Sequence, residues 1–65
     1  MKVFNIGDKV RTNCYKLGNG VVSSGVRMSG AMPFQKVVFD SIPDWMAAQG
    51  QTNEIEIYTV ELIAN

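Results

Sequence analysis

Hydrophobic and polar positions alternate most regularly in two short segments, one near each end of the chain. At residues 54–58, Ile55 and Ile57 alternate with polar side chains, which is the period of a strand with one buried face. Near the start, Val10 lies between charged neighbours in the run 9–14 and predicts a second strand of this kind. The pattern therefore indicates β-structure at both ends.

The first third of the chain reads as short extended pieces separated by turns. Residues 1–6 predict a short lead-in strand, and glycine and aspartate at 7–8 predict a turn. Residues 15–17 are expected to form a loop. The glycine, asparagine and glycine at 18–20 tolerate positive φ and predict a hairpin turn.

Two further strands are predicted in the middle of the chain. Residues 21–28 continue as a second strand, in which Gly25 indicates a bulge or sharp bend of the kind that small barrels need to close. Residues 29–33 predict a flexible connection. The run 34–40 has the highest content of β-forming residues and is expected to be a central strand.

The remaining segments predict little regular structure apart from the strand at 54–58. Residues 43–49 fit either a single helical turn, which Gly50 would end, or an ordered loop. Residues 59–62 are short enough for a 3-10 turn, and residues 63–65 then form a last extended piece.

Together these elements predict an all-β fold, a small five-stranded SH3-like barrel with a short 3-10 turn before the last strand. An OB-type barrel normally needs more residues. With 65 residues the chain forms one domain, 1–65, and its core is small enough that self-association is an expected source of added stability.

The charge balance argues against a nucleic-acid binder. Six lysines and arginines face six acidic residues, so the net charge is zero. The first 30 residues nevertheless carry five basic residues and one acidic residue, while the rest carries one basic and five acidic residues. The charge distribution therefore allows the hypothesis of an acidic face that docks a basic partner. Nucleic-acid contact would have to use the basic residues Lys9, Arg11, Lys16 and Arg27 and would weaken steeply with salt.

Cys14 is the only cysteine, and the chain has no histidine. These two facts exclude an internal disulfide and leave no recognisable metal site and no candidate catalytic residue. We expect Cys14 to lie on a strand as a small buried residue. No run is apolar enough for a signal peptide or a membrane span, which predicts a soluble cytoplasmic protein.

The two ends of the chain resemble one known family. The opening, residues 4–11, reads Phe-x-x-Gly-Asp-x-Val-Arg, and residues 55–58 read Ile-Glu-Ile-Tyr before a tail that contains Leu62. Both segments are similar to those of the plasmid-encoded type II dihydrofolate reductases. The resemblance implies an SH3-like barrel, and in that family four such barrels surround one pore that binds dihydrofolate and NADPH.

The resemblance also assigns roles to four positions. Ile57 and Tyr58 match the family signature, whereas Thr12 stands at the place of the pore lysine and Glu56 at the place of the central glutamine. Four copies of Glu56 around one axis would repel one another, and loss of the lysine weakens attraction for a polyanionic cofactor. Both changes oppose the family's reaction, so we expect a shared fold without reductase activity and without a cofactor.

Aromatic residues provide the other candidates. Trp45 and Met46 form an apolar contact patch, or else Trp45 folds back to cap one end of the barrel. Tyr15 and Tyr58, with Trp45, are the only side chains available for an aromatic peptide-binding groove. Glu56 and its neighbour two residues earlier form a carboxylate pair, for which a solvated strand face is the favoured interpretation.

The sequence thus predicts a small non-enzymatic binding module, such as an accessory protein of a phage or other mobile element. It is expected to act through protein–protein contacts or self-association, with contacts around Trp45 and along the strand face that carries Glu56 and Tyr58. The alternative is a homotetramer resembling the type II reductases, with a small molecule such as NADPH in a central pore.

Overall fold

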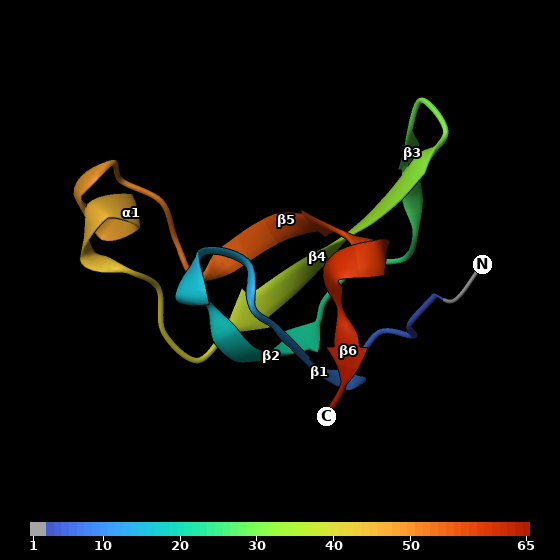
Figure 1. Cartoon of the computed structure of the whole chain (residues 1–65), viewed down its shortest axis with the longest axis horizontal. Helices are drawn as coiled ribbons and strands as arrows, with labels where there is room; N and C mark the ends of the chain where they lie inside the picture. The colour runs from blue at the N-terminus through green and yellow to red at the C-terminus, as the bar shows by residue number, and fades with distance from the viewer. Residues whose placement is uncertain (1–2) are drawn as a thin grey trace.

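The computed structural model describes residues 3–65 and contains one antiparallel sheet, one short α-helix and two 3-10 helices (Figure 1). The elements in chain order are β1 (Lys9–Thr12), η1 (Cys14–Lys16), β2 (Gly18–Val22), β3 (Arg27–Ser29), β4 (Met32–Phe39), α1 (Asp44–Ala48), β5 (Glu54–Tyr58), η2 (Thr59–Glu61) and β6 (Ile63–Ala64). In residues 3–65 no helix has the length and apolar character needed to span a membrane.

The strand β4 is the centre of the sheet. It pairs with β5 along one edge, and along the other edge it pairs first with β3 and then with β2. The strand β1 continues the sheet from β2 and pairs in turn with β6, so the order is β3-β4-β2-β1-β6 with β5 beside β4. Every pairing is antiparallel, which confirms the predicted all-β fold.

The sheet has six strands, one more than the five predicted, because the second predicted strand is divided by a bend. Its two parts, β2 and β3, share one edge of β4 but are separated at residues 23–26. At the bend the Ser23 N–H still donates to the Lys36 carbonyl at 2.8 Å, whereas the Lys36 N–H donates to the Ser24 hydroxyl at 2.9 Å. A side chain thus replaces a backbone acceptor where the ladder breaks.

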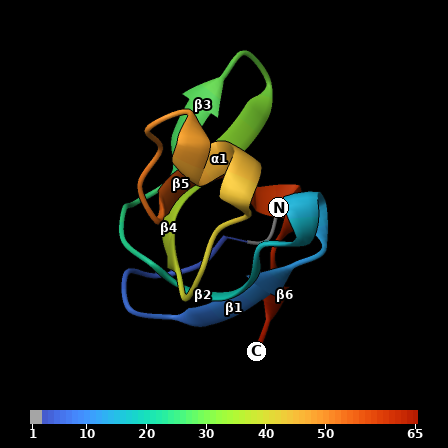
Figure 2. The ribbon, with the colours of Figure 1, turned by 90° about the vertical axis from the view of Figure 1, so that its left-hand side faces the viewer.

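The chain closes the fold through η2. Strand β5 lies at one edge of β4, and η2 carries the chain from there to β6, which pairs with β1. Figures 1 and 2 both show β1, β2 and β6 together on the side of the molecule away from the β3 hairpin. The 3-10 turn before the last strand is confirmed, and so is the helical turn after Pro43.

Three local predictions in the first third of the chain are wrong. Residues 3–5 form no strand, and residues 1–2 lie outside the described part. Cys14 begins the 3-10 helix η1 instead of lying on a strand, so the turn occurs at residues 13–17. The glycines at 18–20 belong to β2 and not to a hairpin turn.

Gly20 is required by a close approach of two strands and not by turn geometry. A Cβ atom at this position would lie 2.7 Å from Val37 Cγ1 and 2.7 Å from the Val38 carbonyl oxygen. Only glycine fits such a contact without a shift of β4. The connection at 29–33 is also tighter than predicted, since β4 already begins at Met32.

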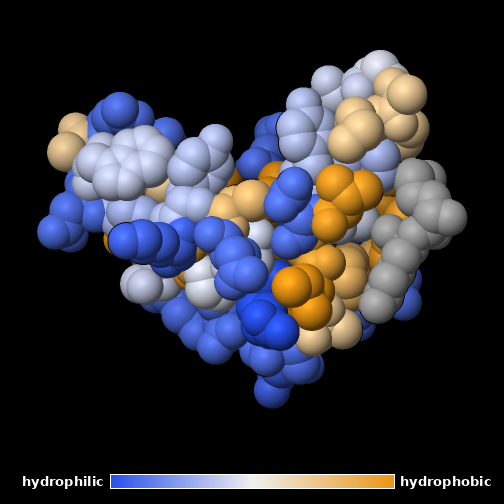
Figure 3. Space-filling model, in the orientation of Figure 1, coloured by the Kyte–Doolittle hydropathy of each residue, from blue (hydrophilic) through white to orange (hydrophobic). Residues whose placement is uncertain are grey.

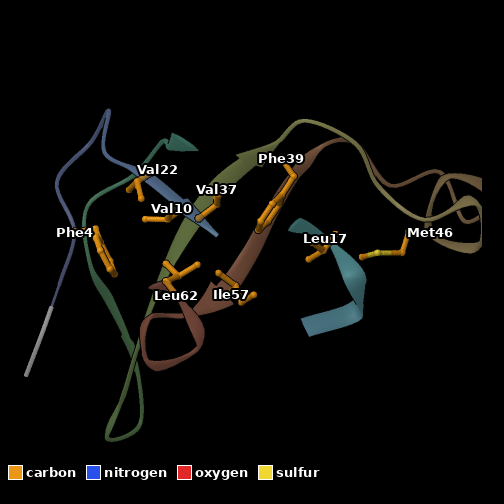
Figure 4. Close-up of a cluster of buried hydrophobic side chains, with 9 residues drawn as sticks. All are labelled: Phe4, Val10, Leu17, Val22, Val37, Phe39, Met46, Ile57 and Leu62. Carbon is orange, nitrogen blue, oxygen red and sulfur yellow. The ribbon is translucent and has the colours of Figure 1, made fainter. Parts of the chain in front are cut away.

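The hydrophobic core runs the length of the domain (Figure 4). Its buried members are Phe4, Val10, Leu17, Val22, Val37, Phe39, Met46, Ile57 and Leu62. At one end Met46 reaches from α1 toward Leu17 (Figure 4). Met46 is 4% exposed, so this side chain, and not Trp45, caps the core at the end nearest α1.

A fully buried glutamine fastens the N-terminal segment to the core. The Gln35 Oε1 atom accepts from the Phe4 N–H at 3.1 Å, and its Nε2 atom donates to the Phe4 carbonyl at 2.7 Å. Nε2 also donates to the Ser24 carbonyl at 3.2 Å, and the Thr59 hydroxyl donates to Oε1 at 3.4 Å. The side-chain amide therefore pairs with Phe4 as a neighbouring strand would.

Candidate functional site

Two adjacent grooves share one wall, the side chain of Tyr15. The first groove has a volume of about 470 Å³ and lies between η1, β5 and η2, and its lining includes Tyr15, Tyr58, Glu56 and Glu61. The second has a volume of about 500 Å³ and lies between η1 and α1, with Tyr15 and Trp45 on its sides. Each is large enough to receive several side chains of a partner.

Figure 3 shows a surface that is indented between two lobes, one formed by the α1 region and one by the β3–β4 hairpin. In the same orientation, Figure 1 shows β5 crossing the space between these lobes. The molecule therefore presents a concave face near β5.

The backbone at Tyr15 adopts a conformation that is rare for a residue with a side chain. Its φ is 52° and its ψ is 19°, and the next residue, Lys16, also has a positive φ of 57°. The left-handed region costs roughly 1–2 kcal/mol for a residue other than glycine. The turn is closed by the Leu17 N–H, which donates to the Cys14 carbonyl at 3.1 Å, and by burial of the Leu17 side chain. As a result Tyr15 projects outward and is 64% exposed.

Helix α1 places Trp45 beside Tyr15. Pro43 precedes the helix, Met46 anchors one face in the core, and Trp45 lies on the outer face with half of its surface exposed. The Trp45 and Tyr15 rings meet edge to face, with centroids 5.9 Å apart and planes at 66°. This contact holds the two rings in a fixed arrangement between η1 and α1.

Strand β5 supplies the floor and one side of the first groove. Ile57 points inward and is 7% exposed, whereas Glu56 and Tyr58 point outward, as the alternation predicts. Tyr58 is 47% exposed and lies directly opposite Phe34 of β4. The groove therefore combines aromatic surface with an exposed carboxylate.

A second carboxylate enters the first groove from η2. The Cys14 thiol donates a hydrogen bond to Glu61 Oε2 at 3.1 Å. This hydrogen bond and partial burial raise the pKa of the Cys14 thiol. Cys14 is therefore a protonated thiol at neutral pH and leaves the negative charge of Glu61 in place.

The structure brings together only part of the predicted site. Glu56, Ile57 and Tyr58 line the first groove, and Trp45 lines the second. Thr12 is 2% exposed, and its hydroxyl accepts a hydrogen bond from the Cys14 N–H at 3.1 Å. The lining of either groove includes neither Thr12 nor the buried Met46.

Neither the place of Glu61 in the first groove nor the position of Tyr15 as a common wall was predicted from the sequence. The direction of Glu61 depends on η2, and a 3-10 turn of three residues carries no periodicity from which a face can be read. The exposure of Tyr15 depends on a left-handed backbone that its sequence does not favour.

No group of three or more histidine, cysteine, aspartate or glutamate side chains in residues 3–65 is arranged to hold a metal ion. Comparisons of the chain with protein-family models, with curated proteins and with solved structures gave no match.

Proposed function

We propose that the chain is a non-enzymatic protein-binding module whose docking surface is built on Tyr15, Trp45 and Tyr58. These three residues are called the aromatic surface below. The observation that carries the proposal is Tyr15, a largely exposed tyrosine that is held at a positive φ and forms a wall of both grooves.

Folding of the domain does not require a tyrosine in the strained conformation of residue 15. Glycine or asparagine would form the same turn at lower free energy, because both adopt the left-handed region readily. The tyrosine ring is 64% exposed and contributes little to the core. Backbone strain of this kind is concentrated at functional sites, so a binding role for the ring explains why a bulky residue stands here.

The composition of the surface also supports a protein partner. Tyrosine and tryptophan offer large rigid contact area with only two side-chain torsions each, and both are enriched among residues that dominate binding energy. Trp45 and Tyr58 are both about half exposed, at 50% and 47%, and the two flank Tyr15 across the adjoining grooves. Contiguous exposed aromatics on a domain of this size typically mark an interaction site.

The test is a selection of random nine-residue peptides, displayed on phage, against the immobilised chain. Enriched clones are expected to lose binding to the Tyr15→Asn and Trp45→Ala variants. The matched control is Val60→Ala, since Val60 is 63% exposed and apolar but is not among the residues that line the grooves. Failure to enrich any clone, or equal binding to the Tyr15→Asn variant, would refute the proposal.

Self-association through the same surface makes a different prediction. Light scattering coupled to size exclusion would then give a mass that falls on dilution, and Tyr15→Asn would give a monomer. A stable tetramer whose mass is unchanged by Tyr15→Asn would instead favour the alternative of a small-molecule pore. Titration with NADPH and dihydrofolate would then test that alternative.

A further inference from the structure

We infer that the partner of the aromatic surface is an extended peptide segment carrying a lysine or arginine, which lies between Glu56 and Glu61 in the first groove. The inference rests on the proposed function and specifies its ligand. Apolar side chains of the same segment then lie against the two sides of the Tyr15 ring.

The first groove is negatively charged and contains no cation of its own. Among residues 3–65 its lining includes the carboxylates of Glu56 and Glu61 and no lysine or arginine. Within residues 3–65 Glu56 makes no hydrogen bond or ion pair with any other side chain. Glu61 accepts a hydrogen bond from the neutral Cys14 thiol, which leaves its charge uncompensated. Two such carboxylates in one concave site favour a cationic group.

In the described part of the chain, Lys36 and Lys16 do not line the first groove. Lys36 is paired in register with Glu56 across β4 and β5, yet the two side chains form no ion pair. Lys16 lines the second groove. The charge along the surface thus changes from negative at the first groove to positive at the second, and this change predicts that the partner's basic residue lies over the first.

An extended chain matches the layout of the grooves. Side chains two residues apart in an extended peptide lie on the same side of the backbone, about 6.5 Å apart. Side chains of such a segment can enter the two adjoining grooves, which share the Tyr15 side chain as a wall. A helical partner would instead lay one face into a single continuous groove.

Single-stranded nucleic acid is the main competing ligand for exposed aromatic rings, because bases stack on them. Here two carboxylates would face the phosphate backbone and repel it. The exposed basic residues Lys9 and Arg11 lie on β1, and neither is among the residues lining a groove. The charge of the groove therefore favours a peptide.

The experiment repeats the random nine-residue selection against the wild-type chain, the double variant Glu56→Gln and Glu61→Gln, and the control Glu54→Gln. Glu54 lies on the same exposed face of β5, is hydrogen-bonded to the Ser23 hydroxyl at 2.9 Å and is not among the groove-lining residues. Wild type and control are expected to enrich lysine or arginine at one peptide position at least threefold over the input library. The double variant is expected to lose that enrichment.

A synthetic peptide of the most enriched clone then gives the affinities. Each glutamine substitution is expected to weaken binding about threefold, and both together about tenfold, as measured for partly exposed ion pairs. The same difference is expected to shrink in 0.5 M sodium chloride, because salt screens exposed charges. Isothermal titration with the folded variants, checked by circular dichroism, provides both measurements.

The outcomes separate the inference from the proposed function. Enriched clones that lack a basic residue but still require Tyr15 would overturn the inference and leave the binding module standing. Absence of any Tyr15-dependent clone would overturn both. Binding of a fluorescein-labelled oligouridylate that Tyr15→Asn abolishes would also overturn the inference, because the groove would then accept a polyanion.

Discussion

The surroundings of Gln35 and of Tyr15 differ in whether the chain itself satisfies their polar groups and relieves their backbone strain. Gln35 lies at the centre of β4 with no exposed surface, and both ends of its amide are hydrogen-bonded. Tyr15 stands at the surface, its backbone is strained, and the carboxylate of Glu56 nearby in the groove has no partner in residues 3–65. The polar groups around Gln35 are satisfied by other groups of the chain. The groove beside Tyr15 contains groups that make no contribution to folding.

The difference indicates how a site can be recognised in so small a domain. A polar group that serves folding is buried and satisfied, as every buried side-chain nitrogen and oxygen in residues 3–65 is. Polar groups that serve binding have no such partner within the chain, since their partners are supplied by another molecule. Substitutions should therefore affect stability at the Gln35 region and binding at the aromatic surface.

The largest effect is expected from Gln35→Leu. It keeps a side chain of similar volume but removes the hydrogen bonds to Phe4 and Ser24, which should lower the free energy of unfolding by about 3 kcal/mol. A domain of this size has a total of roughly 3 to 10 kcal/mol, so the variant should be largely unfolded at moderate temperature. Urea denaturation followed by tryptophan fluorescence measures the change.

Gln35→Glu is the more demanding form of this test. A carboxylate can accept from the Phe4 N–H but cannot donate to the Phe4 carbonyl, and ionising it in the core adds a desolvation penalty. It should be at least as destabilising as Gln35→Leu at pH 7. A loss below about 1 kcal/mol for either variant would show that the amide is not what fastens the N-terminal segment.

The next effect is expected from Gly20→Ala, which should cost about 1–3 kcal/mol because the new methyl group meets Val37 and the Val38 carbonyl. Gly25→Ala is its matched control. No atom of residues 3–65 lies within 4 Å of a Cβ at Gly25, so its effect should stay within about 0.5 kcal/mol. Thermal unfolding of the two variants side by side gives the comparison, and equal losses would contradict it.

A small net effect on stability is expected from Tyr15→Asn. Relief of the left-handed backbone at this residue contributes about 1 kcal/mol. Loss of the edge-to-face contact with Trp45 removes about 1 kcal/mol. The urea midpoint should therefore stay close to that of the wild type while peptide binding is lost, and a marked loss of stability would assign Tyr15 to folding.

The smallest effect is expected from Glu61→Gln on the titration of Cys14. The carboxylate raises the pKa of the thiol, so its removal should lower this pKa toward the ordinary value. Reaction with a disulfide reagent across pH 7–10 measures it. Because the raised pKa favours the protonated thiol in the fold, its contribution to stability is present below the ordinary thiol pKa and is lost as pH rises through the raised value. An unchanged pH profile would exclude the Cys14–Glu61 contact.

The fold could be read from the sequence wherever local pattern and tertiary placement agree. The alternation at residues 54–58 predicted β5 with its observed bounds, and the turn predicted at residues 59–62 is η2, which ends one residue earlier, at Glu61. The error at residues 18–20 arose from glycine. Gly20 has the chemistry of a turn residue, but its place is decided by the approach of β2 to β4, two strands that are distant in the sequence.

The candidate site could be predicted only in part, for a related reason. Glu56 and Tyr58 follow from the strand period, and Trp45 follows from its place after Pro43. Outside the site, the role of Gln35 was not predicted, although this residue shares its strand face with the inward-pointing Val37 and Phe39. Its three partners, Phe4, Ser24 and Thr59, lie on three separate segments, and no local pattern identifies them.

The contact at Gly20 also limits how this chain can evolve. Every amino acid other than glycine has a Cβ atom, and the space for that atom is already taken by Val37 and Val38. Replacement of glycine at this position is therefore disfavoured unless β4 changes at the same time. We expect genes that descend from a common ancestor with this one to keep glycine at position 20 while the surrounding surface diverges.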